Sequence, residues 1–500
     1  MKVLRIHPDD DVAIALADLV SGDDLGGGVA ASQPVPAGHK VAVKAVARGQ
    51  PITKFAQTIG VALADIAPGA HVHTHNLGFR QGMPLAPARK VASPASDHAQ
   101  PTFKGYLRAD GRAATRNVVG ILTTVNCSAT AARLIADRFR GAAMEAWPHV
   151  DGVVALTHRT GCGMASEGEA MDMLRRTIAG YIRHPNFAGV LLVGLGCEAN
   201  QPDRLLAAEG LALSERVRML SIQESGGTAA TVKAGEAMVR EMLDAAETAR
   251  RVDLPASHLA LGLQCGGSDG FSALSANPAL GVAADILVAH GGTAILSETP
   301  EIYGAEHILL SRATSPAVAD ALKARLAWWQ DYTAKSGETL DNNPSPGNKK
   351  GGLTTILEKS LGAVAKGGTS PLAAVYEYAE PVTAKGFVFM DTPGYDPVSA
   401  TGQVAGGANL ICFTTGRGSC FGCKPVPSLK LATNTPLWRR MGDDMDINCG
   451  EILSGGETVE AVGRRIFTRI LATASGEPTA SERLGYGEDE FIPWVLGATV

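Results

Sequence analysis

Four apolar segments that each end in a cysteine constrain the fold of this chain more than any other feature of its sequence. They read NVVGILTTVNC, GVVALTHRTGC, FAGVLLVGLGC and LALGLQC, and the cysteines lie 35, 35 and 68 residues apart, at Cys127, Cys162, Cys197 and Cys265. A strand with its crossover helix takes about 30 residues, so the gaps predict one, one and about two such units, with RVRMLSIQESGG supplying the intervening strand. Continuous apolar strands alternating with helices predict parallel α/β sheets covered on both faces.

Each of these cysteines lies where a strand gives way to a loop at its carboxyl end. Ligands bind at that edge in open α/β sheets, so the thiols are candidate ligands. The alternation continues downstream, with strands expected in TAILSETPE, KGFVFMDTPG and ANLICFTTG and a helix in SPAVADALKARLAWWQDY. Cys412, in the middle of the last of these strands, is expected to be a core residue.

The first eighty residues follow a different pattern. DDDVAIALADLVSG predicts a short amphipathic helix, KVAVKAVA predicts an alternating strand, and PITKFAQTIGVALADIAPGAHVHTHN adds short strands with glycine and proline turns. Residues 1–80 are therefore expected to form a small β-rich module. Residues 81–103 carry four prolines and five alanines without an apolar period, which predicts an extended linker.

Composition narrows the class of partner. Forty-five basic against fifty acidic residues give a net charge of −5 without a basic block, which favours neither nucleic acid nor an anionic membrane. A small-molecule partner is expected instead. No apolar run approaches the roughly 18–20 residues that span a bilayer, and the start, MKVLRIHPDDDV, turns acidic too early for a signal peptide, so a cytoplasmic protein is expected. Eight cysteines in 500 residues are too sparse for a disulfide scaffold.

The stretch HVHTHN places three histidines at alternate positions. On an extended strand His71, His73 and His75 project from one face, because side chains alternate between faces. Neutral imidazoles at this spacing suit iron, zinc and copper. The alternative is a polar strand edge that faces water, and the pattern leaves both interpretations open.

Three of the strand-end cysteines have the stronger ligand pattern. Cys162 in TGCG, Cys197 in GLGCE and Cys265 in QCGGSDG share one predicted sheet edge, and each is followed by glycine or a carboxylate. Glycine lets a backbone approach a ligand, and Glu198 could bind a hard cation or move a proton. The alternative for each cysteine is a small buried hydrophobic residue. The single CxxC pair, Cys420 and Cys423, is at most half of a zinc site.

Three glycine-rich loops are suited to anions. CGGSDGFS (265–272) and TTGRGS (414–419) follow strands, and PSPGNKKGG (344–352) adds two lysines. Arg417 can hold a carboxylate with two parallel hydrogen bonds. The alternative for each loop is an ordinary glycine turn. No GxxxxGK[ST] or GxGxxG lies at the required place, which disfavours nucleotide binding.

Several of these strings together resemble the altronate/galactarate dehydratase family. They are HVHTHN, VGLGCEANQ, CGGSDGFSALSANPALG, PSPGNKKGG, FTTGRGS and DDMDIN, in this order, and the resemblance covers nearly the whole chain. It implies a SAF (β-clip) domain at 1–80, the linker at 81–103, a central α/β domain at 104–253 and a Rossmann-like C-terminal α/β domain at 254–500. The chain departs from better-known relatives at CFGC, which follows GRG. The departure makes Cys420 and Cys423 poor choices for an essential role.

The family dehydrates sugar acids, and its altronate branch depends on iron(II). The histidine-rich end of the SAF domain is typical of altronate dehydratase and of the related sulfolactate sulfo-lyase small subunit, whereas the galactarate branch does not keep it. The resemblance thus implies conversion of D-altronate to 2-dehydro-3-deoxy-D-gluconate, with an aldarate such as galactarate as the alternative substrate. It also implies a homodimer or larger homo-oligomer. The histidines would hold the iron or bring the SAF domain over the active site.

Residues and resemblance together give one hypothesis for the site. Iron(II), with Mn²⁺ as a substitute, would lie at the strand edge on some of three thiols and three imidazoles, those of Cys162, Cys197, Cys265, His71, His73 and His75. Candidate substrate ligands are Lys350, Arg417, Ser268, Asp269 and Asn348. A divalent ion would stabilise the enolate that forms next to the carboxylate. The candidates for the catalytic acid and base are Glu198, His158 and Lys349, and the sequence does not order them.

Two rival hypotheses remain open at this point. An iron–sulfur cluster held by three cysteines is the first, because thiolates suit clusters better than they suit one hard ion. A sugar-acid binding protein without turnover is the second. Such a protein would need the anion loops but not thiols and imidazoles together.

Overall fold

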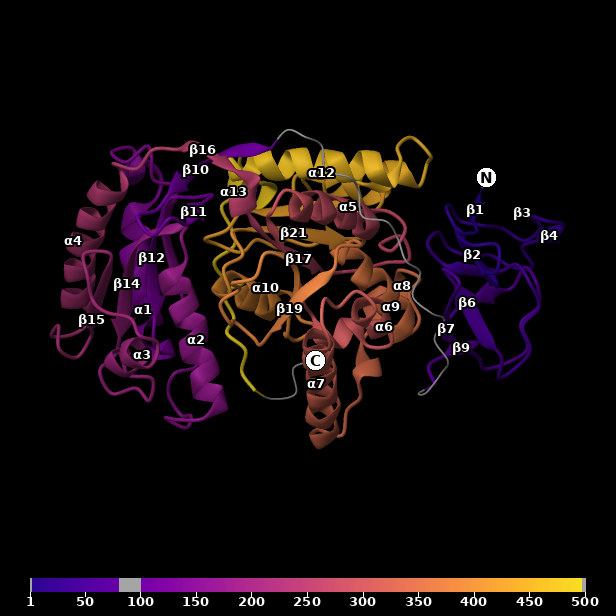
Figure 1. The fold of residues 1–500 in the computed structure, drawn as a ribbon, viewed down its shortest axis with the longest axis horizontal. Helices are drawn as coiled ribbons and strands as arrows, with labels where there is room; N and C mark the ends of the chain where they lie inside the picture. The colour runs from indigo at the N-terminus through magenta and orange to yellow at the C-terminus, as the bar shows by residue number, and fades with distance from the viewer. Residues whose placement is uncertain (1, 81–99, 497–500) are drawn as a thin grey trace.

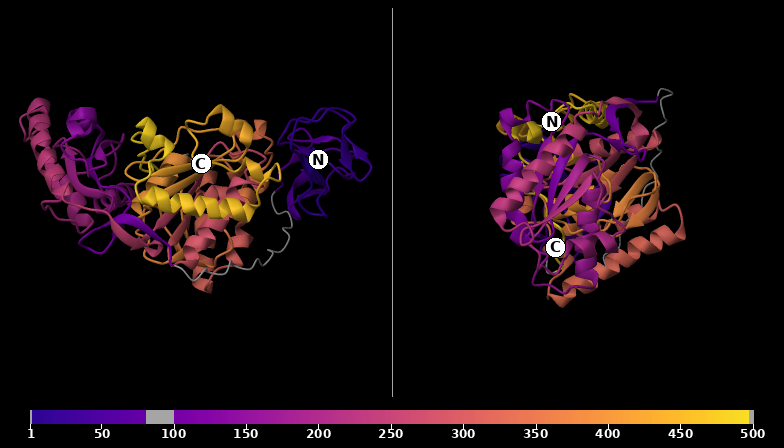
Figure 2. Two further views of the ribbon diagram at one scale, coloured as in Figure 1. Left: turned by 90° about the horizontal axis from the view of Figure 1, so that it is seen from above. Right: turned by 90° about the vertical axis from the view of Figure 1, so that its left-hand side faces the viewer.

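Three folded parts lie in a row along the longest axis of the molecule (Figures 1 and 2). The computed structural model describes residues 2–80 and 100–496. The part that contains β17–β23 occupies the middle, with the N-terminal β module at one end and the part that contains β12–β15 at the other. Spatial order therefore differs from chain order. Within the described residues, no helix is long and apolar enough to cross a membrane.

The N-terminal module is built from short antiparallel strands, as expected. One sheet has the order β1-β2-β5-β8, a second has the order β6-β7-β9, and β3 pairs with β4. The strands are β1 (Val3–Leu4), β2 (Val12–Ala15), β3 (Asp24–Gly26), β4 (Val29–Ala30), β5 (Lys40–Ala42), β6 (Pro51–Lys54), β7 (Gln57–Ala62), β8 (His71–Val72) and β9 (Leu77–Gly78).

The helix predicted in DDDVAIALADLVSG is wrong, because Val12–Ala15 forms strand β2. All four side chains of this strand are buried. Ala13 and Ala15 pack within the module, whereas Ile14 packs against Phe271 and Leu274 of the C-terminal part. The strand is apolar on both faces because a distant segment covers one of them, and a local pattern does not show such a partner.

The central part is a four-stranded parallel sheet of order β13-β12-β14-β15. Helices α1 and α4 pack on one face, and α2 and α3 pack on the other. A three-stranded sheet of order β11-β10-β16 joins this part to the C-terminal part. The elements are β10 (Thr102–Leu107), β11 (Ala113–Ala114), β12 (Val118–Thr123), α1 (Ala129–Ala136), β13 (Gly152–Leu156), α2 (Glu169–Arg183), β14 (Phe187–Gly194), α3 (Pro202–Ala208), β15 (Val217–Ser221), α4 (Thr228–Ala246) and β16 (Val252–Pro255).

The expected linker at 81–103 falls mostly outside the described residues. Its last residues belong to folded structure, because β10 begins at Thr102 and pairs with β16 from Thr102 to Gly105. The extended pattern there is a strand.

The C-terminal part is a seven-stranded parallel sheet of order β19-β20-β18-β17-β21-β22-β23. Helices α5 and α12 cover one face and α10 covers the other (Figure 1). The strands are β17 (Ala260–Cys265), β18 (Thr293–Leu296), β19 (Leu372–Tyr376), β20 (Gly386–Met390), β21 (Leu410–Thr415), β22 (Ser428–Ala432) and β23 (Ile447–Asn448). The helices are α5 (Ala276–Ala289), α6 (Glu306–Leu310), α7 (Pro316–Lys335), α8 (Pro346–Lys350), α9 (Ile356–Val364), α10 (Asp396–Ala405), α11 (Thr435–Arg440), α12 (Val459–Ala474) and α13 (Ala480–Leu484).

Every strand predicted from an apolar run is present, and Cys412 is fully buried in the core as expected. The prediction of one shared cysteine edge is wrong, because the cysteine-ended strands belong to two sheets. The strands before Cys127, Cys162 and Cys197 lie in the central sheet, whereas Cys265 ends β17 of the C-terminal sheet. Pairing between strands is decided by contacts between distant segments, which the run of residues in one strand does not specify.

Candidate active site

The order of the C-terminal sheet reverses direction at β17. The next strand along the chain, β18, pairs with one side of β17, and β21 pairs with the other side. Such a switch opens a crevice at the carboxyl ends of the strands, where ligands bind. A cavity of about 210 Å³ lies at this place. Its chemically active lining residues are Cys265, Glu301, Asn343, Lys359 and Asp396.

A buried cluster of charged side chains lies at the cavity, and its members Glu301 and Lys359 line it. The Lys366 ammonium donates to Cys265 Sγ at 2.8 Å and to Glu298 Oε2 at 3.1 Å. Lys359 Nζ lies 2.6 Å from Glu301 Oε1 and donates to Asn343 Oδ1 at 2.7 Å. Glu298 and Lys366 have no exposed surface. Charges buried this deeply need partners, and here opposite charges supply them.

Burial and neighbouring charge set the protonation of this cluster. Burial, with Glu301 beside it, raises the pKa of Glu298 to about 8. Burial would also raise the pKa of Glu301, but Lys359 and Lys366 lower it to below its ordinary value. Burial raises the pKa of the Cys265 thiol in spite of Lys366. The cluster therefore holds one carboxyl that titrates near neutral pH beside one that stays ionised.

Three of these side chains could hold a metal ion. Cys265, Glu298 and Glu301 each offer one ligand atom, and these atoms lie within 4.8 Å of one another. The buried Glu298 Oε1 has no hydrogen-bond partner among the described residues. A thiolate with two carboxylates suits Fe²⁺ or Mn²⁺, so the donor set fits such an ion. The cation would compete with the proton on Glu298 and with the Lys366 ammonium.

Asp396 faces the cavity from the first turn of α10. Burial, with Glu301 nearby, raises its pKa to about 6. Its carboxylate lies directly against the backbone of Gly266, where an added Cβ would collide with it. The glycine after Cys265 therefore allows an acid–base group to approach the carboxyl end of β17.

A buried ionic triad attaches the N-terminal module, which lies next to α8 and α9 (Figure 1). Lys40 of β5 and Lys54 of β6 each donate to Glu358 of α9 at 2.8 Å. Thr354 donates to the same carboxylate at 2.7 Å. All three charged side chains are at most 1% exposed. Burial would raise the pKa of Glu358, but Lys40 and Lys54 lower it far below its ordinary value.

The histidines of HVHTHN lie at the same contact. Strand β8 ends at Val72, so only His71 of the three histidines lies on a strand as predicted. His73 and His75 lie in the turn that follows, which Asn76 closes with hydrogen bonds to the backbone of His71 and His73. Even so, the rings of His71, His73 and His75 lie together, with centroids 5.5 Å apart for His71–His73 and for His71–His75. His39 joins them, its Nδ1 lying 3.0 Å from His71 Nε2.

Two of these imidazoles contact the backbone of α8. His73 Nε2 lies 2.8 Å from the carbonyl oxygen of Lys349, and His39 Nε2 lies 3.2 Å from that of Lys350. Burial lowers the pKa of His73, and burial together with the neighbouring imidazoles of His39, His73 and His75 lowers that of His71 to about 4, so both are neutral at pH 7. Among the described residues the ring nitrogens do not form a trio within 4.8 Å. The observed role of the histidines is contact with the loop beside the cavity.

The anion loops also meet at this edge. Asn348 lines the cavity, caps α8 and donates to Ser268 O at 2.9 Å. Asp269 is buried and accepts from Ser272, Thr433 and Asn434. These polar groups are thus engaged in fixing the loops that surround the cavity.

The predicted cations of these loops lie farther out. Lys349 is partly exposed and Lys350 and Arg417 are exposed. The backbone of Arg417 donates to the carbonyl of Gly267 at 2.9 Å, which keeps its loop next to the cavity-lining glycine. The structure therefore brings Cys265 and the three anion loops together with the histidine module.

The structure does not bring the other predicted site residues to this cavity. Cys162 and Cys197 are exposed on loops of the central sheet, at the end of the molecule opposite the N-terminal module (Figure 2). Glu198 accepts from Thr124 at 2.7 Å and from two loop amides, and His158 Nε2 lies 3.0 Å from Thr123 O. Both side chains hold central-domain loops. These positions contradict the hypothesis of one metal centre that joins Cys162 and Cys197 to the histidines of HVHTHN.

Comparison with known proteins decides the family. Residues 1–80 match the altronate/galactarate dehydratase SAF domain, residues 105–247 the D-galactarate dehydratase/altronate hydrolase second domain, and residues 256–499 the D-galactarate/altronate dehydratase C-terminal domain. The altronate dehydratase of Bacillus subtilis (strain 168) is 36% identical over 97% of both chains. The chain belongs to the altronate/galactarate dehydratase family. It is a hydro-lyase of that family.

Two further relatives are similar to this dehydratase over nearly the whole chain. The galactarate dehydratase (L-threo-forming) of Escherichia coli (strain K12) is 37% identical, over 96% of this chain and 94% of its own. The altronate dehydratase of the same strain is 34% identical over 98% of both chains. Relatives with different named substrates are thus about equally similar, and the substrate of this dehydratase does not follow from identity alone.

Sequence reasoning missed most of the charged residues of the cavity. Glu298 and Glu301 lie in SETPEI, Lys359 and Lys366 in LEKSLGAVAKGG, and Asp396 in PGYDP. Single carboxylates and lysines in such contexts are ordinary surface residues. One signal was available, because charged residues followed apolar strands in the C-terminal part just as the cysteines did.

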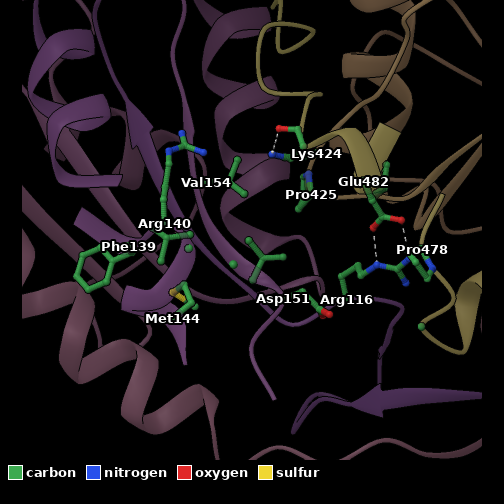
Figure 3. A pocket seen from close by; sticks show the side chains of 17 residues that line it. Arg116, Phe139, Arg140, Met144, Asp151, Val154, Lys424, Pro425, Pro478 and Glu482 are labelled. Carbon is green, nitrogen blue, oxygen red and sulfur yellow. Dashed lines mark hydrogen bonds and ion pairs between the residues drawn. The ribbon is translucent and has the colours of Figure 1, made fainter. Parts of the chain in front are cut away.

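A larger cavity of about 430 Å³ lies between the central and C-terminal parts (Figure 3). Its cations already have partners: Arg116 lies 2.6 Å from Glu482, and Lys424 lies 3.0 Å from Glu488. Arg140 lies 2.8 Å from Asp137. Lys359 at β17 is paired as well, so the presence of a cation does not separate the two cavities. The metal-capable trio of Cys265, Glu298 and Glu301 lies at the β17 cavity, which favours that cavity as the candidate active site.

Proposed function

We propose that this enzyme dehydrates D-altronate to 2-dehydro-3-deoxy-D-gluconate and water in the cavity at the carboxyl end of β17. The observation that carries the proposal is the presence of a carboxyl with a raised pKa, a cation and a metal-capable trio at one crevice. Two of the relatives named above are altronate dehydratases. The histidine-rich end of the SAF domain, typical of that branch, supports the same substrate.

The substrate carboxylate would bind next to Lys359. This ammonium faces the cavity and is held by Glu301 and Asn343. An ammonium fixed in a low-dielectric site stabilises negative charge more strongly than one in water. The charge that develops on the carboxylate when C2 loses its proton would therefore be stabilised by Lys359.

Asp396 would move the proton. As a carboxylate it takes the proton from C2, and the electron pair of that bond forms the C2–C3 double bond as the C3–O bond breaks. The leaving hydroxide takes the proton from Asp396 and departs as water. The enol product then tautomerises to the 2-keto-3-deoxy acid. A pKa near 6 suits a group that must accept and then return a proton near neutral pH.

Cys265, Glu298 and Glu301 would hold the iron(II) or manganese(II) that the family implies. The bound ion would supply Lewis-acid stabilisation of the enolate charge. Glu298 would release its proton on binding, because the pKa of this buried carboxyl is raised to about 8 in the metal-free protein.

A substrate panel tests the proposal. Reduced, iron-loaded enzyme should form 2-keto-3-deoxy acid from D-altronate with a kcat/KM at least tenfold above that for galactarate and other aldonates. Production of keto acid is measured with a colorimetric assay and confirmed by mass. A preference for galactarate would move the assignment to the galactarate branch. Absence of product from every sugar acid would instead favour a sugar-acid binding protein without turnover.

Removing the thiol of the metal-capable trio should weaken metal binding. Cys265→Ser replaces a soft thiolate by a hydroxyl that stays protonated at neutral pH, so Fe²⁺ or Mn²⁺ affinity should fall at least tenfold. Anaerobic calorimetry with Mn²⁺ measures this change. Cys449→Ser is the matched control, because Cys449 is also buried but lies in the core away from the trio. Equal affinity in both variants would contradict the assignment.

A further inference from the structure

Three thiols that the cavity does not use lie at one edge of the central sheet. Cys127 follows β12, Cys162 follows β13 and Cys197 follows β14. The three strands are neighbours in the sheet, with β12 in the middle, and all run parallel. Their carboxyl ends therefore share an edge. All three cysteines are free and exposed.

Hydrogen bonds tie the three cysteine loops into one unit. The backbone of Asn126, next to Cys127, donates to Thr160 O of the second loop at 3.0 Å. The backbone of Asn200, in the third loop, donates to Gly161 O of the second at 3.0 Å. Thr124 of the first loop donates to Glu198 of the third at 2.7 Å. Each of these bonds lies within three residues of a cysteine, so the three loops that carry the thiols are held to one another.

Glycines with positive φ lie next to two of the cysteines. Gly161 and Gly163 flank Cys162 with φ of 93° and 70°, and Gly196 precedes Cys197 with φ of 126°. Left-handed residues next to right-handed ones turn successive N–H groups toward one side, as at many phosphate and iron–sulfur sites. Gln223 adds a side-chain donor, with Nε2 at 3.4 Å from Cys197 Sγ. Hydrogen bonds to sulfur are a feature of cluster sites.

The donor set favours a cluster over a single hard ion. The three candidate ligands are all thiols, whereas the Cys265 trio combines one thiol with two carboxylates. Soft thiolates suit iron–sulfur clusters. An exposed site with three soft ligands therefore fits an iron–sulfur cluster better than a mononuclear centre.

We propose that Cys127, Cys162 and Cys197 bind a [4Fe–4S] cluster in the central domain, separate from the metal-capable trio at Cys265. Three protein thiolates leave one iron of such a cluster without a protein ligand. That iron would be open to a small oxygen ligand, such as a carboxylate or a hydroxide. The inference does not depend on which sugar acid the enzyme dehydrates.

Anaerobic reconstitution tests the proposal. Full-length protein is incubated with ferrous iron, sulfide and a thiol reductant, desalted, and analysed for iron, acid-labile sulfide and visible absorption. Wild-type protein should retain about four acid-labile sulfides per chain, with about four irons in addition to any iron that the Cys265 trio binds. The triple variant Cys127→Ser, Cys162→Ser and Cys197→Ser should lose the sulfide and the visible bands. Iron at one atom per chain without sulfide would overturn the proposal.

Two matched variants separate this site from the other thiols. Cys265→Ser should keep the cluster, because its thiol belongs to the other sheet. Cys420→Ser removes another exposed thiol and should keep it as well. Loss of the cluster in either variant, or its retention in the triple variant, would contradict the assignment. Circular dichroism checks the fold, and Cys127→Ser alone must lower cluster content if the triple variant does not fold.

Discussion

Replacing Asp396 with asparagine should lower kcat by about 10²–10⁴-fold, the range for loss of a positioned general acid–base group. Asparagine keeps the shape of the side chain and its place against Gly266 but cannot accept the C2 proton. Because the amide is nearly isosteric, KM should change much less than kcat. Steady-state formation of the 2-keto-3-deoxy acid measures both. Asp331→Asn, on the exposed side of α7, is the control and should retain activity.

The pH profile gives the same variant a second readout. Asp396 has a pKa raised to about 6, mainly by burial. The base must be ionised in the free enzyme, so kcat/KM should fall as pH decreases below about 6 and level off above it. The residual kcat/KM of Asp396→Asn should not show this fall, the acidic limb of the pH profile. Retention of both the limb and more than a tenth of kcat would exclude Asp396 as the base.

Replacing Lys40 with methionine should destabilise the attachment of the N-terminal module by about 1.5–3 kcal/mol, the contribution of a hydrogen bond to a charged group. Glu358 would keep Lys54 and Thr354 as partners but would lose one of its two buried cations. Urea denaturation, with hydrogen exchange of α9 as a local probe, measures the change. Lys44→Met is the matched control in the same module. Lys44 is exposed and lies 3.8 Å from Asp11, so its loss should cost about 0–1 kcal/mol.

Acid should release the same contact. The folded-state pKa of Glu358 is lowered, whereas in the unfolded chain it is about 4.3. A carboxyl with a lowered folded pKa contributes stability that is present above its unfolded pKa and is lost as pH falls toward its folded pKa. The wild-type protein should therefore lose stability below about pH 4, and Glu358→Gln should lose it at neutral pH. A Glu358→Gln variant as stable as wild type at pH 7 would contradict the role of the triad.

The strands were predictable from sequence because a buried parallel strand is apolar along its length, as in FAGVLLVGLGC and LALGLQC. Their division between two sheets was not, since pairing depends on segments far apart in the chain. The same reason explains why β2 was predicted as a helix, because its apolar residue Ile14 is covered by the distant residues Phe271 and Leu274. Strands β19, β22 and β23 were missed, because their short runs carry polar residues or stand beside turns.

The candidate site was predictable only where a residue type is informative by itself. Cys265 and the glycine-rich loops were found because thiols and glycine clusters are uncommon after strands. Glu298, Glu301 and Lys366 were not, since a carboxylate or a lysine becomes exceptional only when it is buried. Burial of these charges follows from the packing of α9 and the turn after it against the sheet, which no local pattern records.

Helix α9 carries Glu358 and Lys359 side by side, one paired with the N-terminal module and the other facing the cavity. Lys40 and Glu358 are 318 residues apart in the chain. A ribosome that adds about 5–20 residues per second therefore takes about 16–64 s to deliver the partner of a module it finished early. During that interval Lys40 and Lys54 of the nascent module lack their carboxylate partner and stay hydrated, and the lining of the cavity is not complete until Asp396 has been added.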